Sequence, residues 1–440
     1  MRAHTDLAAG ADLAAGAGLA ARALLAALLA AAGCNGAIAA PTSDAGTTQP
    51  APAAAATLTP TCTCEEEAVP PPPHDQLALT KAKWKDLPGW TDDKLAEAVP
   101  SFLASCAVIA TLADSAAVGH DGHGGIAKQW RHACAAAAKL KAGDDAAARA
   151  FFEAEFVPWQ AAGKAGPDGK LTGYFVQEIN ASRKKSGKYQ TPILARPKDL
   201  VMIDLSQFVG DAHGRRLWGR HDDKGNIVPY FTRSEIRKGA LKDQKLEIMY
   251  ADDPIDVLFA HIEGSAKAVM DDGSIVWLEF DGKNGRAYKG VGKALKERGV
   301  LTGAYNGTMP GIRKWFVDNP KKFDEVVDQN ASFVFFKESS KAGAVGSQGV
   351  TLTTRRSMAI DRAFIAHGTP IWVDGRAPVP GKQGTIPYRS LLIAQDTGGG
   401  ILGAVRGDIY WGDDAVAEDL AGRMGGPGRY WLLLPKGVAK

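Results

Sequence analysis

Two carboxylates separated by a glycine-rich loop are the residues of this chain best suited to chemistry. The apolar run at 391–394 predicts a strand that is buried on both faces, and it leads to Asp396. The glycines at 398–400 allow left-handed turns and the close approach of another chain. Asp408 follows, directly before apolar and aromatic residues at 409–411. Such neighbours raise the pKa of a carboxyl group, as a general acid needs near neutral pH. The alternative is that Asp396 caps the turn and Asp408 lies at a solvated strand edge.

The segment at 394–412, AQDTGGGILGAVRGDIYWG, resembles the signature of the three-aspartate (3D) domain of the lytic murein transglycosylase A family. Further blocks occur in the family's order, namely LTGYF at 171–175, YQTPILARP at 189–197, GKNGRAY at 282–288 and QNASFVFF at 329–336. The resemblance covers the chain from about residue 85 to its end. It therefore implies a fold, a reaction and roles for individual residues.

The implied reaction is cleavage of the β-1,4 bond between N-acetylmuramic acid and N-acetylglucosamine in peptidoglycan, without water and with 1,6-anhydro ends. By resemblance the chain is a peptidoglycan lytic exotransglycosylase that acts on glycan strands, with no cofactor or metal. The family's catalytic aspartate stands before a pair of apolar or aromatic residues, which assigns catalysis to Asp408. Asp396 at the triglycine turn and Asp361 in a backbone network are expected to support it.

Two of the blocks are expected to line a groove for the glycan. The first block reads roughly TGYYEPE in the family, and this chain departs from it at Phe175 and Gln177. Strand alternation predicts that only one of Tyr174 and Phe175 packs in the core, and Gly173 suggests a bulge or the close approach of a ligand. The substrate-binding residues implied by both blocks are Thr172, Gly173, Tyr174, Glu178, Lys283, Asn284 and Tyr288.

Two other functions stay open. A non-catalytic barrel module would bind peptidoglycan in the same groove without cleaving it, since a fold does not fix a function. Glu263 and Ala266 stand where the family has Gln and Gly, which keeps this alternative in view. A hydrolytic muramidase needs a second carboxylate near the scissile bond, and Glu263 or Glu178 is the candidate.

Many short strands with Gly and Pro turns predict a mainly β fold that contains a barrel. The resemblance makes this a double-psi β-barrel domain with N-terminal helices and an inserted second β-rich domain. The implied boundaries are 76–178 and 330–440 for the barrel domain and 179–329 for the insert.

Periodicity and turn signals predict the individual elements. Helices are expected after residues 90–93, around Trp130, and at 144–156, 290–298 and 309–319. Strands are expected at 171–175, 189–196, 329–336 and 429–434, with a hairpin at 268–280 and a strand, turn and strand over 358–373. The motif HDGH at 120–123 resembles a metal site only superficially, and a solvated loop is expected there.

The N-terminus has the layout of an export signal. Arg2 and Arg22 precede an apolar segment at 23–32, which is too short to span a bilayer. It ends in LAAAGC, which resembles a bacterial lipobox with Cys34 as the lipidated residue; the alternative is an ordinary cleaved signal. Because Asn35 follows, the sorting rule implies a lipid anchor at the periplasmic face of the outer membrane of a Gram-negative bacterium. Residues 35–75, rich in Ala, Pro and Thr, are expected to form a disordered linker.

The remaining cysteines and the charge balance add further expectations. Cys106 and Cys134 fall in consecutive predicted helices, which leaves a disulfide and two buried free thiols both open. Cys62 and Cys64 lie in the linker, and no catalytic role is expected for them. Lys and Arg number 52 against 49 Asp and Glu, and no basic run carries interleaved aromatics, so a nucleic-acid partner is not expected. Cell-wall synthesis or degradation complexes are the protein partners to consider.

Overall fold

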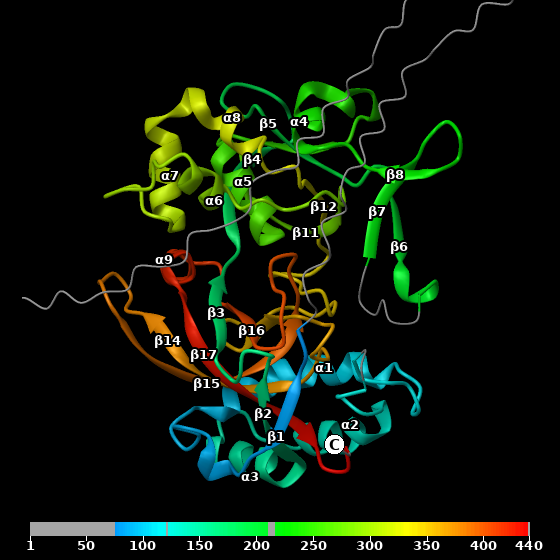
Figure 1. The fold of residues 1–440 in the computed structure, drawn as a ribbon, viewed down its shortest axis with the longest axis vertical. Helices are drawn as coiled ribbons and strands as arrows, with labels where there is room; N and C mark the ends of the chain where they lie inside the picture. Colours follow the sequence, from blue (N-terminus) through cyan, green and yellow to red (C-terminus); the bar gives the residue numbers. More distant parts are fainter. Residues whose placement is uncertain (1–74, 120–121, 210–215, 439–440) are drawn as a thin grey trace, which may run out of the picture. The chain divides into compact units, whose positions relative to one another are not determined.

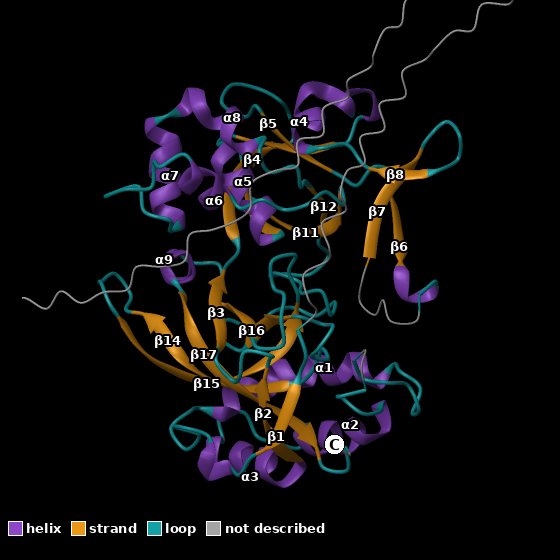
Figure 2. Ribbon diagram, in the orientation of Figure 1, coloured by secondary structure: helices purple, strands orange, loops and turns teal. Residues whose placement is uncertain are grey.

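The computed structural model describes residues 75–119, 122–209 and 216–438 (Figure 1). The expected signal, nearly all of the expected linker, and the residues Cys34, Cys62 and Cys64 lie outside these ranges. Within the described residues the strands form three sheets, and the fold is mixed α and β but mainly β (Figure 2). None of the helices described is both long enough and apolar enough to cross a membrane.

The largest sheet has eight strands and is barrel-like. Its strands, in hydrogen-bonded order, are β1 (Ala78–Lys81), β2 (Phe156–Ala162), β17 (Gly425–Pro435), β14 (Pro370–Pro378), β15 (Thr385–Asp396), β13 (Ser357–Ile360), β16 (Arg406–Tyr410) and β3 (Gly169–Tyr174). The long strand β17 pairs along its length with β3, β14 and β2, and β3 also pairs with β16. The pairings from β3 through β16, β13, β15 and β14 to β17 therefore form a ring, which confirms the expected barrel-like sheet.

The strand β15 is buried on both faces because it lies between two hydrophobic clusters. Its residues 391–394 are 0% exposed. Leu391 and Ile393 pack with residues of the N-terminal helices, whereas Leu392 and Ala394 pack inside the barrel-like sheet. This alternation confirms the predicted strand, and it fixes from both sides the element that ends at Asp396.

The helices expected near the N-terminus are confirmed as α1 (Val99–Ala110), α2 (Ala127–Ala137) and α3 (Asp145–Glu155). Asp144 caps α3, since its side chain accepts a hydrogen bond from the Ala147 amide at 2.9 Å. These helices gather near β1 and β2, and they contact β15, β17 and β2 (Figure 2). The remaining helices are α4 (Arg233–Glu235), α5 (Pro254–Glu263), α6 (Val291–Glu297), α7 (Met309–Asp318), α8 (Phe323–Val327) and α9 (Ala415–Arg423), of which α6 and α7 were expected.

A second sheet has six strands. In order these are β12 (Val334–Glu338), β11 (Ile275–Lys283), β10 (Ser265–Met270), β4 (Gln177–Ser182), β9 (Glu247–Ala251) and β5 (Thr191–Leu194). The expected hairpin is β10 and β11, and its turn uses Gly273 at a φ of 83°. A third sheet has three strands, β6 (Val201–Asp204), β7 (Arg216–His221) and β8 (Ile227–Pro229).

One strand was assigned to the wrong sheet. We expected the strand at 329–336 to return to the barrel, but β12 pairs with β11 in the six-stranded sheet. Asn284 explains this placement, because its backbone amide donates to the Phe333 carbonyl and its side chain accepts from the Phe333 amide. The sequence shows an apolar strand here but not its partner strand, whose paired residues lie 51 to 60 positions upstream.

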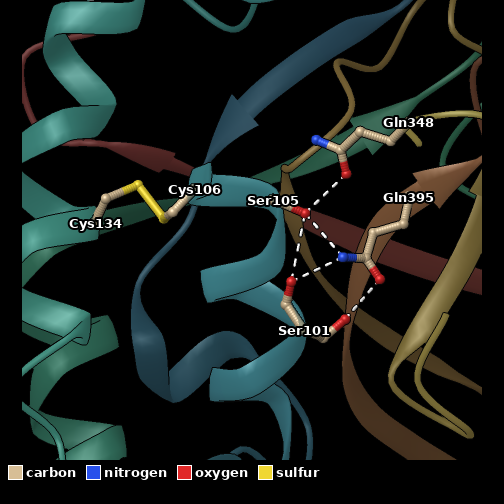
Figure 3. The surroundings of a disulfide bond; sticks show 6 residues. All are labelled: Ser101, Ser105, Cys106, Cys134, Gln348 and Gln395. Atoms are coloured by element: carbon tan, nitrogen blue, oxygen red, sulfur yellow. Dashed lines mark hydrogen bonds between the residues drawn. A yellow bond between two sulfur atoms is a disulfide. The ribbon is translucent and has the colours of Figure 1, made fainter. Parts of the chain in front are cut away.

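A disulfide joins α1 to α2, which resolves the alternative left open by the sequence. Cys106 and Cys134 are bonded, with their Cα atoms 5.6 Å apart (Figure 3). In that view Cys106 points from α1 toward α2, whereas Ser101 and Ser105 of the same helix point toward Gln395. The disulfide therefore anchors a helix whose other side contacts the strand that carries Asp396.

Replacing both cysteines by serine should lower the free energy of unfolding by about 3 kcal/mol, because the bond closes a loop of 28 residues in the unfolded chain. Urea unfolding of the double variant, and of the unchanged protein with and without reductant, measures this loss. Replacing only Cys134 should cost as much as replacing both. A double variant as stable as the unchanged oxidised protein would contradict the prediction.

Candidate active site

Asp408 is the end of a chain of hydrogen bonds across two parallel strands. In the register of β16 and β3, Asp408 stands beside Thr172, and the Thr172 hydroxyl donates to Asp408 Oδ1 at 2.5 Å. Thr172 Oγ1 in turn accepts from Arg406 Nη2 at 2.7 Å. Arg406 also donates to the Gly407 carbonyl at 2.5 Å. The guanidinium therefore acts on the carboxyl group through one hydroxyl rather than by a direct ion pair.

The pKa of Asp408 is shifted in a direction that suits proton donation. Burial raises the pKa, the Thr172 hydrogen bond and Arg406 lower it, and the nearby charge of Asp396 raises it again, with a net upward shift. The residue is half-buried and not fully enclosed. This combination fits a carboxyl group that gives up and takes back a proton.

Asp396 is held at the end of β15 by three donors. Its Oδ2 accepts from the Tyr174 hydroxyl at 2.9 Å, and its Oδ1 accepts from the amides of Ser347 and Thr397, both at 2.8 Å. Burial raises its pKa, and these hydrogen bonds oppose that rise. Asp396 therefore orients Tyr174, whose ring lies 5.4 Å from that of Tyr410 on the strand of Asp408.

A buried polar network supports the strand beneath Asp396 (Figure 3). Gln395 is 0% exposed, accepts from Ser101 at 2.7 Å and donates to Ser105 at 2.9 Å. Ser105 donates to Gln348, the neighbour of the Ser347 amide that holds Asp396. A fully hydrogen-bonded network of this kind fixes one geometry, because any displacement would leave buried polar groups unpaired.

Asp361 accepts hydrogen bonds from the backbone amides of two separate loops and so holds them together. Its Oδ1 accepts from the Ala363 amide at 3.0 Å, and its Oδ2 accepts from the Gly403 amide at 2.8 Å. The left-handed turn expected at the glycines 398–400 is not found, since none of them has a positive φ; the left-handed residue of this loop is Gly403, with a φ of 123°. The triglycine stretch instead lets another part of the chain come close to its backbone. The Lys283 side chain does so, since a Cβ atom on Gly399 would lie 3.8 Å from Lys283 Nζ.

Residues beyond the barrel-like sheet surround the site, and one of them, Glu263, interacts with Asp408. Glu263, the last residue of α5, accepts from the Phe175 amide at 3.3 Å. Burial raises the pKa of Glu263 well above its usual range, and the charge of Asp408 adds to the rise. Lys283 of β11 is half-buried, and burial lowers its pKa. Tyr288 is 49% exposed, and its pKa is raised by burial and then by Glu263. A second carboxyl group therefore lies close to Asp408, and a lysine lies beside the triglycine stretch that follows Asp396.

A metal site is not seen among the residues that the structure describes, where no three His, Cys, Asp or Glu side chains group together. The HDGH motif is only partly within the described ranges, since 120–121 fall outside them.

Two family models match the chain, the MltA specific insert domain over residues 170–337 and the 3D domain over residues 356–434. The crystal structure of MltA from Neisseria gonorrhoeae is 30% identical, with a TM-score of 0.66 over 82% of this chain and 93% of that chain. The chain belongs to the MltA family. A membrane-bound lytic murein transglycosylase from Agrobacterium tumefaciens has a TM-score of 0.70 at 28% identity, over 82% of this chain and 98% of that chain.

Curated relatives match over a shorter part of the family fold. The membrane-bound lytic murein transglycosylase A of Vibrio cholerae is 36% identical over 207 residues, which are 46% of this chain. The match spans 55% of the length of that relative. The resemblance inferred from the sequence blocks is therefore confirmed at the level of the family.

Some residues of the MltA-like blocks do not have the surroundings that we expected. Asn284 is 0% exposed and donates to the carbonyls of Phe231 and Ala331, so it cannot contact a glycan and instead fixes the backbone. Gly173 is required by packing, because a Cβ atom there would lie 2.4 Å from Trp411 Nε1. The assignment of Asn284 to substrate binding was wrong, since burial and backbone contacts cannot be read from a motif, whereas that of the half-buried Gly173 stays a prediction.

Other expected groove residues are used within the protein. Tyr174 and Phe175 are both buried, because β3 ends at Tyr174 and the strand alternation ends with it. The Tyr174 hydroxyl donates a hydrogen bond to Asp396, and the Thr172 hydroxyl donates one to Asp408. Glu178 is exposed and pairs with Lys267 at 3.2 Å.

Sequence reasoning missed Arg406 and Gln395 in this MltA-family site. Arg406 lies two residues before Asp408, on the same face of β16, so strand alternation could have pointed to it. Gln395 interrupts an apolar run, and a polar residue in a buried strand needs partners. The partners of Gln395 are Ser105 and Ser101, which lie 290 and 294 residues away along the chain, so the sequence pattern around Gln395 does not reveal them.

Proposed function

We propose that this protein is a lytic transglycosylase that cleaves the β-1,4 bond between N-acetylmuramic acid and N-acetylglucosamine and leaves 1,6-anhydro ends. The observation that carries the proposal is the half-buried Asp408, whose pKa is raised by burial while Thr172 donates to it. Family membership supports the reaction, since relatives are named lytic murein transglycosylases.

In this mechanism one carboxyl group acts twice. Protonated Asp408 donates to the leaving glycosidic oxygen while an oxocarbenium-like state develops at C1 of the muramic acid. The resulting carboxylate takes the proton of the C6 hydroxyl, and O6 bonds to C1 to close the anhydro ring. The attack is intramolecular, so it gains the effective molarity that bulk water lacks.

The hydrogen-bond chain from Arg406 to Asp408 suits this cycle. Burial favours the protonated acid before the first step, whereas Thr172 and Arg406 stabilise the carboxylate between the two proton transfers. The net shift of the Asp408 pKa is upward, toward the range in which a single group can both donate and accept a proton. Asp396 and Tyr174 would orient the strand ends beside the sugar.

A hydrolytic reaction is the second candidate, because Glu263 supplies a carboxyl group whose pKa responds to Asp408. Glycosidases that use water need a second carboxylate as base or nucleophile. Burial raises the pKa of Glu263 well above its usual range, which disfavours the carboxylate form that a base or nucleophile needs.

Mass spectrometry of products from purified peptidoglycan tests the proposal. Muropeptides with 1,6-anhydro ends, one water lighter than reducing ones, are expected, and a Glu263→Gln variant should give the same products. Anhydro-monomers from the start of digestion would indicate exo action. Reducing ends that disappear in Glu263→Gln would establish the hydrolase instead, and intact sacculi with bound protein would leave only a binding module.

Replacing Thr172 by valine should move the alkaline limb of the kcat/KM profile to higher pH by about one unit. Activity needs protonated Asp408 and falls as pH rises through its pKa; the Thr172 hydroxyl lowers that pKa, so its loss raises it. Activity measured across pH checks this, with Thr80→Val on exposed β1 as the matched control. An alkaline limb that stays in place, or moves to lower pH, would argue against Asp408 as the acid.

The finer architecture and location are part of the same proposal. We assign the ring of strands to a double-psi β-barrel, with an insert between β3 and β13 that contains the six-stranded sheet. Thr172, Tyr174, Glu178, Lys283 and Tyr288 would border the glycan groove.

Relatives named membrane-bound support anchoring of this chain through Cys34 at the periplasmic face of the outer membrane. Cell fractionation of a Cys34→Ala variant tests the anchor.

A further inference from the structure

A pocket of about 690 Å³ lies within the region of the six-stranded sheet, and none of the acids described above lines it. Its walls are largely apolar and include Leu258, Phe316, Phe323 and Phe333. Pockets that bind small organic ligands have volumes of roughly 300–1,000 Å³ and a few well-placed polar groups in apolar walls. Exposed residues such as Val317 also line it, so it opens to solvent.

Arg233 lies in this pocket without a direct ion pair among the described residues, and the nearby charge of Asp328, which pairs with Arg237, acts on it only at a longer range. It is 4% exposed, and its hydrogen-bond partners are neutral, the Asn330 carbonyl at 3.2 Å and His261 Nδ1 at 2.9 Å. Among the described residues no ion pair joins it to a carboxylate; of the acids in the lining, Asp324 pairs with Arg237 and Asp253 with Arg313. Burial, and then Arg237, lower the pKa of Arg233 to about 10, so the guanidinium keeps its charge at neutral pH. A buried cation of this kind is costly unless an anion joins it.

His261 adds a second donor to the same lining. A guanidinium can only donate, so His261 Nδ1 accepts from Arg233. Burial and Arg233 lower the pKa of His261 well below its usual value, so the ring is neutral and its proton lies on Nε2. His261 is 8% exposed, and Nε2 is buried without a hydrogen-bond partner in the described structure. Both residues line the pocket, and one donor, His261 Nε2, has no acceptor in the described structure.

We propose that this pocket binds a small monocarboxylate with an apolar body. The carboxylate accepts hydrogen bonds from Arg233 and His261 Nε2, and the apolar body packs against Leu258 and Phe316. A guanidinium matches a carboxylate in geometry as well as charge, which favours this group over a neutral amide. The proposal does not depend on the reaction at Asp408. Either an acyl chain or the C-terminus of a short peptide carries this chemistry.

Isothermal titration calorimetry on the full-length chain tests the site with hexanoate, its neutral analogue hexanamide, and N-acetyl-D-alanyl-D-alanine. At least one of the two carboxylates should bind about 10-fold or more tightly than hexanamide. The tighter of the two identifies the source of the natural ligand. His261→Phe keeps a ring against Phe336 and should weaken carboxylate binding by about 10-fold.

A surface variant keeps the test decisive if changes at the pocket floor impair folding. Val317 is 61% exposed and lines the pocket, so Val317→Trp should block binding without disturbing the core. Ile275→Trp, at a 54% exposed position of β11 outside the pocket lining, is the matched control and should bind as the unchanged chain does. Binding of both carboxylates no tighter than that of hexanamide, no binding of either carboxylate, or undiminished binding by Val317→Trp would each overturn the proposal.

Discussion

Asp408→Asn should abolish turnover while the protein still folds and binds peptidoglycan. Asparagine keeps the size of the side chain and an oxygen that can accept from Thr172, but it cannot donate a proton and reclaim it. Loss of general acid–base catalysis costs about 10²–10⁴-fold in rate, and here one group carries both proton transfers, so the upper end is expected. Release of anhydro-muropeptides from purified peptidoglycan measures the rate, and co-sedimentation with sacculi measures binding.

A matched control separates catalysis from charge and fold. Asp374 lies on β14 of the same sheet and pairs with Arg389 at 2.8 Å, so Asp374→Asn makes the same chemical change away from the site. This control should keep nearly full activity. Substantial turnover by Asp408→Asn, within tenfold of the unchanged protein, would remove Asp408 from the mechanism and direct attention to Glu263.

The same variant should also be at least as stable as the unchanged protein at neutral pH. The pKa of Asp408 is raised in the folded state, chiefly by burial, so its contribution to stability is complete below the ordinary aspartate pKa. That contribution is lost as pH rises through the folded-state pKa, because the buried site disfavours the charge. Asparagine has no charge to bury, so the stability difference should move in favour of the variant as pH rises from 3 to 7.

The sequence predicted local features well where the signal lay within one stretch. The buried run of β15, the acids at 396 and 408, the hairpin of β10 and β11 and the N-terminal helices depend on residues that are close in the chain. The family resemblance added what composition could not, namely that the distant β3 and β16 blocks belong to one site. Their register then brings Thr172 beside Asp408.

Features set by long-range packing could not be predicted in the same way. Asn284 looked like a sugar-binding amide, but its surroundings come from Phe231 and Ala331, which lie 53 and 47 residues away. The glycine at 173 looked available to a ligand, whereas Trp411 occupies the space beside it. Side-chain type and strand alternation indicate what a residue can do, but its neighbours decide which of those roles remains.

Arg356 is the clearest case of a residue that no motif indicated, and it links the N-terminal region to the barrel-like sheet. It is 5% exposed and donates to both oxygens of Asp93, at 2.8 and 2.9 Å, and to Glu97 at 2.9 Å. It also donates to Ser390 at 2.9 Å, and the Leu391 amide donates to Asp93 at 2.8 Å. The Arg356–Asp93 pair therefore holds the start of the buried run that leads to Asp396.

Asp93→Ala should lower the free energy of unfolding by about 3–5 kcal/mol, because it leaves a buried guanidinium and the Leu391 amide without their partner. Glu97→Ala removes a carboxylate from the same arginine, but the Glu97 side chain is 57% exposed, so its loss should cost less than about 1 kcal/mol. Urea unfolding of the two variants measures the difference, with far-UV circular dichroism as a check that each is folded at the start. Equal losses of stability in the two variants would contradict this prediction. They would mean that the Arg356–Asp93 pair contributes no more than the exposed Arg356–Glu97 pair, and that the N-terminal region is attached to the barrel-like sheet mainly by its apolar contacts.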